Sequence, residues 1–264
     1  MIIAVDTGGT KTLVVAFSRD GTPLRQHKFP TPRDQATYLE AVRQSIVSLS
    51  EGQPLDGISL ALPGVVRDQV AVICKNLDWH NFDIIGALRQ QWPHAPMWLE
   101  NDANLGGVGA ANLINPRPHR LLYVTISTGV NGGLVIDGHI DQDTAEDELG
   151  DIIIDYGGQP TTWEQIAGGA AISAVYDQPI RDLTDQTVKD EISRRIARGL
   201  EIVIERYRPD IVAIGGGIGA HYALFAESVE RELPDSHCPI IIAPNPEEIV
   251  AYGCYFHARN QLGI

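Results

Sequence analysis

Short apolar runs alternate along this chain with longer segments in which apolar residues recur at helical spacing. The short runs predict buried strands at Ile2–Val5, Leu13–Phe17, Ile58–Leu62, Pro96–Leu99, Ile211–Ile214 and Ile240–Ala243. The helical pattern is clearest over 38–49 and from about Asp185 to Tyr207, where Pro209 ends it. A hairpin is predicted over 65–73, and further helices over 84–92, 103–113, 163–176, about 221–233 and from about 247. Strands that alternate with helices indicate an α/β fold.

One pattern occurs twice. Residues 3–21 and residues 122–138 each hold an apolar strand, a turn rich in glycine and hydroxyl side chains, a second apolar strand and a closing Asp-Gly pair. Glycine lets backbone N–H groups surround an anion, and hydroxyl groups add donors. Either turn alone is typical of an ordinary β-hairpin. Their matching positions, with Asp6 in the first turn, favour a duplicated fold that holds one polyphosphate from two sides.

The composition narrows the classes of partner. The 264 residues carry a formal net charge of −14, which argues against DNA, RNA or an anionic membrane as the main ligand, because those need basic surfaces. Backbone amides and a metal ion can still hold a phosphate. The widely spaced Cys74, Cys238 and Cys254 fit free thiols in a reducing cytoplasm. The chain begins on a strand and has no apolar run that spans a bilayer, so we expect a cytoplasmic protein without a signal peptide.

Seven short motifs follow one another in the order found in one family. They are DTGGTKT at 6–12, LPG at 62–64, NLDW at 76–79, ENDAN at 100–104, STGVNGG at 127–133, ELG at 148–150 and IGGGI at 214–218. Each motif alone is weak evidence. In this number and order they resemble the ROK family of sugar kinases and repressors, within the actin-like ATPase superfamily, over nearly the whole chain.

The resemblance implies a fold and an activity. The fold is a two-lobed actin-like ATPase (ribonuclease H-like) α/β architecture with duplicated mixed sheets flanked by helices. The N-terminal lobe would comprise 1–115 plus about 248–264 and the C-terminal lobe 116–247, with a proline-containing linker at 115–119. The implied activity is transfer of the γ-phosphoryl group of ATP, with Mg²⁺, to a hydroxyl of a hexose or hexose analogue, most often the 6-hydroxyl. A homodimer through the C-terminal lobe is also implied.

The chain departs from the family pattern directly after the ELG motif at 148–150. Asp151 stands where the family usually has a histidine, and the stretch after it lacks the cysteines that, with that histidine, hold a structural zinc. A zinc site that has lost most of its ligands has little affinity, so the remaining ligand is free to change. We therefore expect no structural zinc and an altered substrate pocket.

Two aspartates are the candidate chemical groups. The resemblance makes Asp102 the general base, since a carboxylate within hydrogen-bond reach of a sugar hydroxyl can accept its proton. The alternative is that Asp102 caps the helix that follows it. Asp6 ends a hydrophobic strand beside the first glycine turn and is the candidate Mg²⁺ ligand, directly or through water. The alternative is an Asx-turn acceptor that stabilises the loop.

The remaining candidates bind the two substrates. The candidate ATP and phosphate contacts are Asp6, Gly8, Gly9, Thr10, Lys11, Thr128, Gly129, Gly216 and Gly217. The candidate sugar contacts are Asn76, Asn101, Asp102, Glu148, Asp151 and Glu164, because amides and carboxylates suit neighbouring hydroxyls. For the glycines the alternative is an ordinary turn or close packing. For Glu164 it is a first-turn glutamate favoured by the helix dipole.

Other functions are weighed beside the sugar kinase. One is a sugar- or nucleotide-sensing protein without catalysis; the acidic charge and the first strand at Met1 argue against a DNA-binding repressor, and the presence of both Asp6 and Asp102 argues against a silent sensor. Another is a kinase that uses inorganic polyphosphate as the donor. A third is a kinase of a non-sugar acceptor such as a cyclitol, which the change at Asp151 keeps open.

Overall fold

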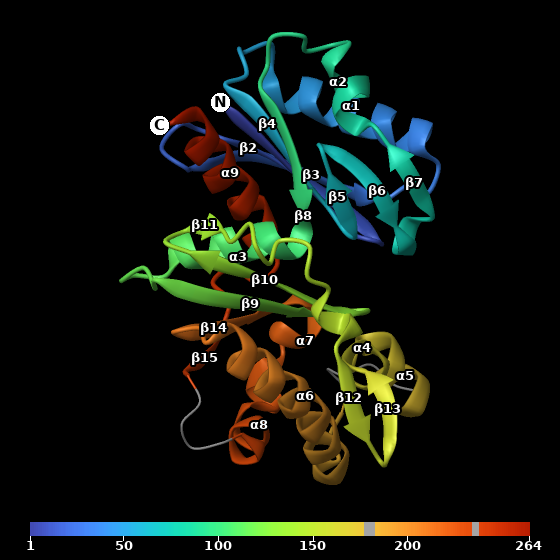
Figure 1. The fold of residues 1–264 in the computed structure, drawn as a ribbon. Helices are drawn as coiled ribbons and strands as arrows, with labels where there is room; N and C mark the ends of the chain where they lie inside the picture. The colour runs from blue at the N-terminus through green and yellow to red at the C-terminus, as the bar shows by residue number, and fades with distance from the viewer. Residues whose placement is uncertain (177–182, 234–237) are drawn as a thin grey trace. The chain divides into compact units, whose positions relative to one another are not determined.

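The computed structural model describes residues 1–176, 183–233 and 238–264 (Figure 1). They form two compact units, which we call the N-terminal unit (1–109 with 250–264) and the C-terminal unit (110–249). The boundary between them falls inside a helix, α3 (Asp102–Leu113), and at the start of the last helix, α9 (Ile249–Leu262).

The N-terminal unit is built on a five-stranded mixed sheet in the order β3-β2-β1-β4-β8. Its strands are β1 (Ile2–Thr7), β2 (Lys11–Phe17), β3 (Pro23–Pro30), β4 (Gly57–Leu62) and β8 (Met97–Asn101). The first three strands are antiparallel neighbours, whereas β4 and β8 run parallel to β1. The central strands are continuous apolar runs because helices cover both of their faces. Their carboxyl ends therefore meet at one edge, which carries the candidate residues of this unit.

Helices cover the two faces of this sheet with different residues. On one face, alternate strand residues such as Val5 and Val14 pack with Tyr38 of α1 (Gln35–Ser50), and α2 (Ile84–Arg89) closes the same core. On the other face Phe17 stacks on Tyr255 of α9, with ring centroids 5.0 Å apart. A second, three-stranded sheet of β5 (Val65–Arg67), β6 (Val70–Cys74) and β7 (Trp79–Phe82) follows β4.

The C-terminal unit repeats the same sheet topology. Its order is β11-β10-β9-β14-β15, with β9 (Arg120–Ile126), β10 (Val130–Ile136), β11 (His139–Ile140), β14 (Ile211–Gly215) and β15 (Ile240–Ile242). As in the first unit, three antiparallel strands are followed by two that run parallel to the first. The predicted duplicated α/β fold with mixed sheets is confirmed.

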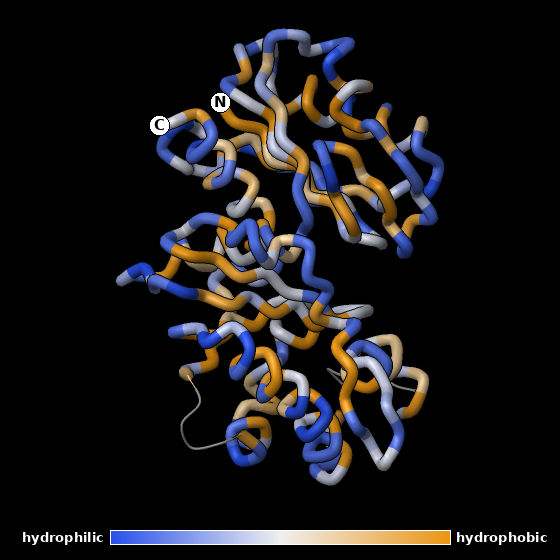
Figure 2. Tube along the Cα trace, viewed as in Figure 1, coloured by the Kyte–Doolittle hydropathy of each residue, from blue (hydrophilic) through white to orange (hydrophobic). Residues whose placement is uncertain are grey.

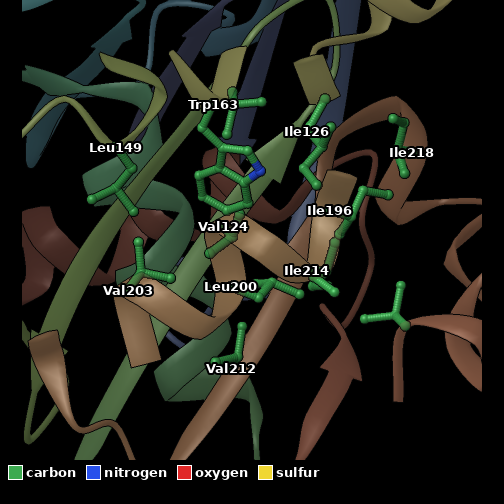
Figure 3. Close-up of a cluster of buried hydrophobic side chains, with 14 of the residues drawn as sticks. Val124, Ile126, Leu149, Trp163, Ile196, Leu200, Val203, Val212, Ile214 and Ile218 are labelled. Atoms are coloured by element: carbon green, nitrogen blue, oxygen red, sulfur yellow. The ribbon is translucent and has the colours of Figure 1, made fainter. Parts of the chain in front are cut away.

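One long helix, α6 (Gln186–Tyr207), packs on the sheet and forms the core of the C-terminal unit with it. The other elements of this unit are the hairpin β12 (Ile153–Tyr156) and β13 (Gln159–Thr162), and the helices α4 (Trp163–Ala167), α5 (Gly169–Tyr176), α7 (Gly216–Gly219) and α8 (Ala226–Glu232). In Figure 3 the indole of Trp163 lies among Val124, Ile196 and Leu200. A Cβ added at Gly199 would collide with that indole, so glycine is what lets Trp163 pack onto α6.

The element boundaries differ from the sequence prediction at several places. The strands β3, β7 and β13 contain no apolar run that would predict them, and all but one of the residues of β3 are exposed. Strand β12 starts in the apolar run 152–154, which was not predicted as a strand. The predicted helix over 163–176 is two helices, because Gly168 adopts an extended conformation between them. The predicted helix over 221–233 begins as a 3₁₀ turn at Tyr222–Leu224, and the one over 84–92 ends at Arg89.

The hydropathy of the chain follows this arrangement (Figure 2). Hydrophobic residues concentrate in the sheet strands of each unit, and the helices alternate between hydrophobic and hydrophilic positions. Among the helices that the structure describes, none combines the length and the apolar character needed to cross a membrane.

Candidate active site

The turn between β1 and β2 holds three of the candidate phosphate contacts, Gly8, Gly9 and Thr10, and Lys11 follows as the first residue of β2. It is closed by a hydrogen bond of 2.9 Å from the Gly8 amide to the Lys11 carbonyl. Thr31 braces it from the next strand connection: its hydroxyl donates to the Gly8 carbonyl at 2.8 Å and its amide to the Thr10 carbonyl at 3.0 Å. A Cβ added at Gly9 would lie 3.3 Å from Cβ of Asn76. The fold therefore brings the turn beside a candidate sugar contact that is far away in the sequence.

Asp6 lies on β1 in a row of residues that crosses the whole sheet. The strand registers pair Lys28 with Leu13, Leu13 with Asp6, Asp6 with Ala61, and Ala61 with Glu100. Paired residues point to the same face, so Lys28, Asp6 and Glu100 share one face. Burial, followed by the charge of Asp102, raises the pKa of Asp6 to about 7, and Lys28 opposes the rise. No described residue forms a hydrogen bond with this carboxylate, so the structure gives no support to the Asx-turn alternative.

Asp102 is the first residue of α3, directly after β8. The alternative that Asp102 caps this helix needs correction, because the preceding residue is the main cap. The side-chain oxygen of Asn101 accepts hydrogen bonds from the amides of Ala103 at 2.8 Å and Asn104 at 3.2 Å. Asp102 accepts only from the amide of Ala103, at 2.9 Å. Burial raises the pKa of Asp102 to about 6, and this hydrogen bond limits the rise.

Asn101 also ties the cap to a turn on a neighbouring strand. Its side-chain amide donates 2.8 Å to the carbonyl of Gly64, in the turn that follows β4. Gly64 has a φ of 105°, and a Cβ there would collide with the carbonyl of Ile73. The side chain of Asn101 thus makes three hydrogen bonds within the protein and is 7% exposed. These hydrogen bonds give Asn101 a structural role, and a sugar contact remains a prediction.

Asn76 lies in the 3₁₀ turn Lys75–Leu77 between β6 and β7, and it is exposed. Trp79, from the same motif, is 1% exposed and packs on Tyr38 with ring centroids 4.7 Å apart. Its indole N–H donates to the carbonyl of Arg33 at 2.5 Å. The guanidinium of Arg33 in turn donates to the carbonyl of Asn76 at 3.0 Å. Sequence reasoning missed Arg33, because it lies outside every motif.

In the C-terminal unit, the turn between β9 and β10 carries Thr128 and Gly129. The carbonyl of Thr128 accepts from the amide of Ala170 at 3.0 Å, at the start of α5. A Cβ added at Gly129 would collide with the carboxylate of Glu164. That carboxylate accepts from the amide of Val130 at 3.0 Å. Glu164, a candidate sugar contact, therefore packs directly on the candidate phosphate turn.

Asn131 follows Val130 in the same hairpin and binds the side chain of Glu148. Its side-chain amide donates to the Glu148 carboxylate at 3.0 Å, and its oxygen accepts from the amides of Gly132 at 2.8 Å and Leu149 at 3.2 Å. Asp151 is exposed at the end of the 3₁₀ turn Leu149–Asp151, and its amide donates to the carbonyl of Glu148 at 3.1 Å. Sequence reasoning did not assign this role to Asn131.

Gly216 and Gly217 follow β14 and open α7. Gly216 has a φ of 77°, and a Cβ there would lie 2.7 Å from the carbonyl of Ile126, so close packing on β9 requires this glycine. A Cβ at Gly217 would meet nothing within 4 Å. Close packing explains why residue 216 is glycine, whereas the open space around Gly217 leaves room for a ligand.

The described residues contain no group of three or more His, Cys, Asp or Glu side chains arranged to hold a metal ion. Mg²⁺ does not need such a group, because it commonly binds one or two carboxylates together with water and substrate phosphates. The partly buried carboxylate of Asp6, beside the glycine turn, fits that kind of binding. The absence of a structural zinc remains a prediction.

Comparisons with known proteins give one consistent result. The sequence model described as ROK family matches residues 2–238. A glucokinase of Streptomyces coelicolor is 25% identical over 256 residues, which cover 86% of this chain and 80% of the relative. A xylose repressor of Bacillus subtilis is 29% identical over 128 residues, which cover 45% of this chain and 33% of the relative.

A solved structure shares the fold. It is a ROK family glucokinase from Streptomyces griseus in complex with glucose and AMPPNP, with a TM-score of 0.82 and 22% identity. The alignment covers 98% of this chain and 99% of that one. The shared fold therefore extends over both compact units.

Proposed function

The chain belongs to the ROK family, and from this premise we propose that it is a sugar kinase that transfers the γ-phosphoryl group of ATP to a hydroxyl of a hexose or hexose analogue. The family assignment confirms the resemblance drawn from the seven motifs. We further propose the 6-hydroxyl as the acceptor, Mg²⁺ as the metal, the cytoplasm as the location and a homodimer through the C-terminal unit as the assembly.

The observation that carries the proposal is the state of Asp102. Its carboxylate is partly buried at the start of α3, with a pKa raised to about 6. A general base works best when its pKa lies near the working pH, because it is then ionised and still basic enough to accept a proton. Because Asn101 takes the capping role, the helix uses only one oxygen of Asp102, which accepts from the amide of Ala103, and leaves the other oxygen available. That oxygen is the proposed acceptor of the sugar hydroxyl proton.

Asp6 and the first glycine turn are proposed to bind the phosphates of the donor. Asp6 would hold Mg²⁺, directly or through water, and the metal would neutralise phosphate charge when bound. The N–H groups and hydroxyls of Gly8, Gly9 and Thr10 would donate to phosphate oxygens, with Lys11 as an exposed cation at the same turn. The bracing of this turn by Thr31 keeps its donors in place without a ligand.

The C-terminal unit would supply the remaining contacts. Thr128 and Gly129 are the proposed second phosphate turn, and Gly216 and Gly217 the proposed site of the adenine ring. Glu148, Asp151 and Glu164 are the proposed sugar contacts of this unit, in addition to Asn76 and Asn101 of the N-terminal unit. The hydrogen bonds from Asn131 to Glu148 and from Val130 to Glu164 support this role, because they fix both carboxylates on one hairpin.

The second candidate function is a sugar- or nucleotide-sensing protein without catalysis. The partial match to the xylose repressor of Bacillus subtilis favours it. Asp6 and Asp102, both with raised pKa, favour the kinase instead, because a sensor does not need a carboxylate base. Inorganic polyphosphate as the donor and a cyclitol as the acceptor are variants of the first proposal.

A coupled assay of ADP release tests the proposal. The full chain is supplied with MgATP and a panel of hexoses, amino sugars, N-acetyl sugars and cyclitols, with Asp102→Asn as the inactive control. We expect turnover on one acceptor that the variant loses. If no acceptor is turned over with ATP or polyphosphate while sugars still bind by calorimetry, the kinase is excluded and the sensor is supported.

A further inference from the structure

Arg33 lies in the segment that connects β3 to α1, and this segment rests on the first glycine turn. Two residues before Arg33, Thr31 donates hydrogen bonds to the carbonyls of Gly8 and Thr10. One residue after it, Asp34 caps α1 by accepting from the amide of Thr37 at 2.8 Å. The backbone of Arg33 is therefore fixed between the glycine turn and a helix start.

The backbone carbonyl and the guanidinium of Arg33 both contact residues 75–79, the segment that carries the candidate sugar contact Asn76. Its carbonyl accepts from the buried indole of Trp79 at 2.5 Å, and its guanidinium donates to the carbonyl of Asn76 at 3.0 Å. Asn76 is the residue whose Cβ would lie 3.3 Å from a Cβ at Gly9. The guanidinium thus lies where the proposed phosphate turn and the proposed acceptor segment meet, and every contact involved is inside the N-terminal unit.

The guanidinium keeps most of its hydrogen-bonding capacity. An arginine side chain has five N–H donors in a planar fork, and one of them is used, by Asn76. Arg19 and Arg25 of the same unit form ion pairs with Asp56 and Glu51. Arg33 is exposed and pairs with no carboxylate in the part of the chain that the structure describes, although acidic residues outnumber basic ones by 34 to 20. A fixed, unneutralised arginine in an acidic protein is suited to an anionic ligand.

We propose that Arg33 binds the phosphoryl group during its transfer, as a further catalytic residue of the N-terminal unit. The identity of this group as a donor phosphoryl rests on the proposed function. In the reaction the bond from the γ-phosphorus to the bridging oxygen breaks with its electrons leaving on ADP, the acceptor oxygen bonds to phosphorus, and its proton passes to Asp102. Arg33 forms no covalent bond; its N–H groups donate to the non-bridging oxygens, where the negative charge is spread.

A purely structural role is the competing explanation, because Arg33 also anchors Asn76. The two roles predict different losses. A structural role would disturb acceptor binding through Asn76 and leave phosphate binding intact. A phosphate-binding role would weaken phosphate binding and slow turnover while the KM of the acceptor stays nearly constant.

The experiment uses the full chain, Arg33→Gln, Arg33→Lys and the control Arg89→Gln. Arg33→Gln removes the charge but keeps an amide donor for Asn76. Arg89 is an equally charged, exposed residue of the same unit, on α2, which holds none of the candidate site residues. Binding of inorganic tripolyphosphate with Mg²⁺ is measured by calorimetry, and kcat and KM are measured on the acceptor found active.

We expect Arg33→Gln to weaken tripolyphosphate binding by about tenfold or more, the loss typical of one or two charge-assisted hydrogen bonds. Arg33→Lys should recover part of it, and Arg89→Gln should bind like the unaltered chain. In turnover, Arg33→Gln should lower kcat while the acceptor KM changes by less than about twofold.

Three results would overturn the assignment: tripolyphosphate binding that is absent from the unaltered chain, tripolyphosphate binding that is unchanged in Arg33→Gln, and a variant whose only defect is a raised acceptor KM. A chain that is inactive on every acceptor, but binds tripolyphosphate in a way that depends on Arg33, would refute the kinase and keep the phosphate site.

Discussion

Asp6 and Asp102 are electrostatically coupled: the negative charge of Asp102 adds to the effect of burial in raising the pKa of Asp6 to about 7. Asp102 itself has a pKa of about 6, raised by burial. The two carboxylates reach the same region from β1 and from the start of α3, nearly a hundred positions apart in the chain. Ionising both costs free energy in the absence of a cation, which links the chemistry of this site to pH and to stability.

Turnover should depend on pH through these two groups. A base must be deprotonated to accept a proton, so kcat/KM for the acceptor should be constant above about pH 8 and fall as the pH drops through about 7 and 6. An ordinary aspartate would place this fall near its usual pKa, at about 4. The measurement is a pH profile of initial rates at constant ionic strength.

The variant Asp102→Asn tests whether Asp102 itself is the general base. It should lower kcat about 10²- to 10⁴-fold, the usual contribution of a general base, and leave a residual rate with no acidic fall near pH 6. Acceptor affinity measured by calorimetry should stay close to that of the unaltered chain. A profile that keeps the same acidic fall in the variant would assign it to another group.

Removing the charge of Asp6 should stabilise the protein without ligands. The folded-state pKa of about 7 lies above the ordinary value of 3.8, so the folded state binds more protons between these pH values. The free energy of unfolding therefore falls as the pH rises from about 4 to 7. Asp6→Asn avoids this loss. Its free energy of unfolding should exceed that of the unaltered chain by about 1–3 kcal/mol at about pH 8, and the two should differ little at about pH 4.

Urea denaturation in the presence of a chelator measures this difference. Asp20→Asn is the control, and it should change the free energy of unfolding in the opposite direction. The hydroxyl of Ser18 lowers the pKa of Asp20, so the charged form of Asp20 favours folding. If Asp6→Asn were less stable at both pH values, hydrogen bonding rather than burial would govern Asp6.

Asn101→Ala should destabilise the N-terminal unit. The change removes the cap of α3 and leaves the carbonyl of Gly64 without its side-chain donor. We expect a loss of about 1–3 kcal/mol, the sum of a lost cap and a lost buried hydrogen bond. Thermal melts monitored by circular dichroism test it, with the exposed Gln90→Ala as the control. An unchanged melting temperature would mean that the cap is dispensable and would return Asn101 to a purely ligand-binding role.

The two glycines after β14 should respond differently to alanine. A methyl group at Gly217 meets nothing within 4 Å, so Gly217→Ala should melt like the unaltered chain and raise the KM of ATP if the adenine lies there. Gly216→Ala should lower the melting temperature, because its φ of 77° and the nearby Ile126 carbonyl disfavour a side chain. Equal KM values for ATP in Gly217→Ala and the unaltered chain would place the adenine elsewhere.

The sequence by itself determined the fold class and the family. Continuous apolar strands, the repeated Asp-Gly hairpin and the order of seven motifs identify a duplicated α/β protein, because these patterns are local and each is written in consecutive residues. The candidate residues Asp6 and Asp102 were also identified in this way. Strand β3 was missed since it is an exposed edge strand with no apolar alternation.

Only the tertiary structure decided which of these residues are structural and which residues lie close together. Whether Asn101 or Asp102 caps α3 depends on backbone geometry at the end of β8, and the sequence permits either. The row that aligns Lys28 with Asp6 depends on the register of three strands. Arg33 gains its position from contacts with Asn76 and Trp79, more than forty residues away. Such pairings arise from packing between distant segments, so no local pattern in the sequence can encode them visibly.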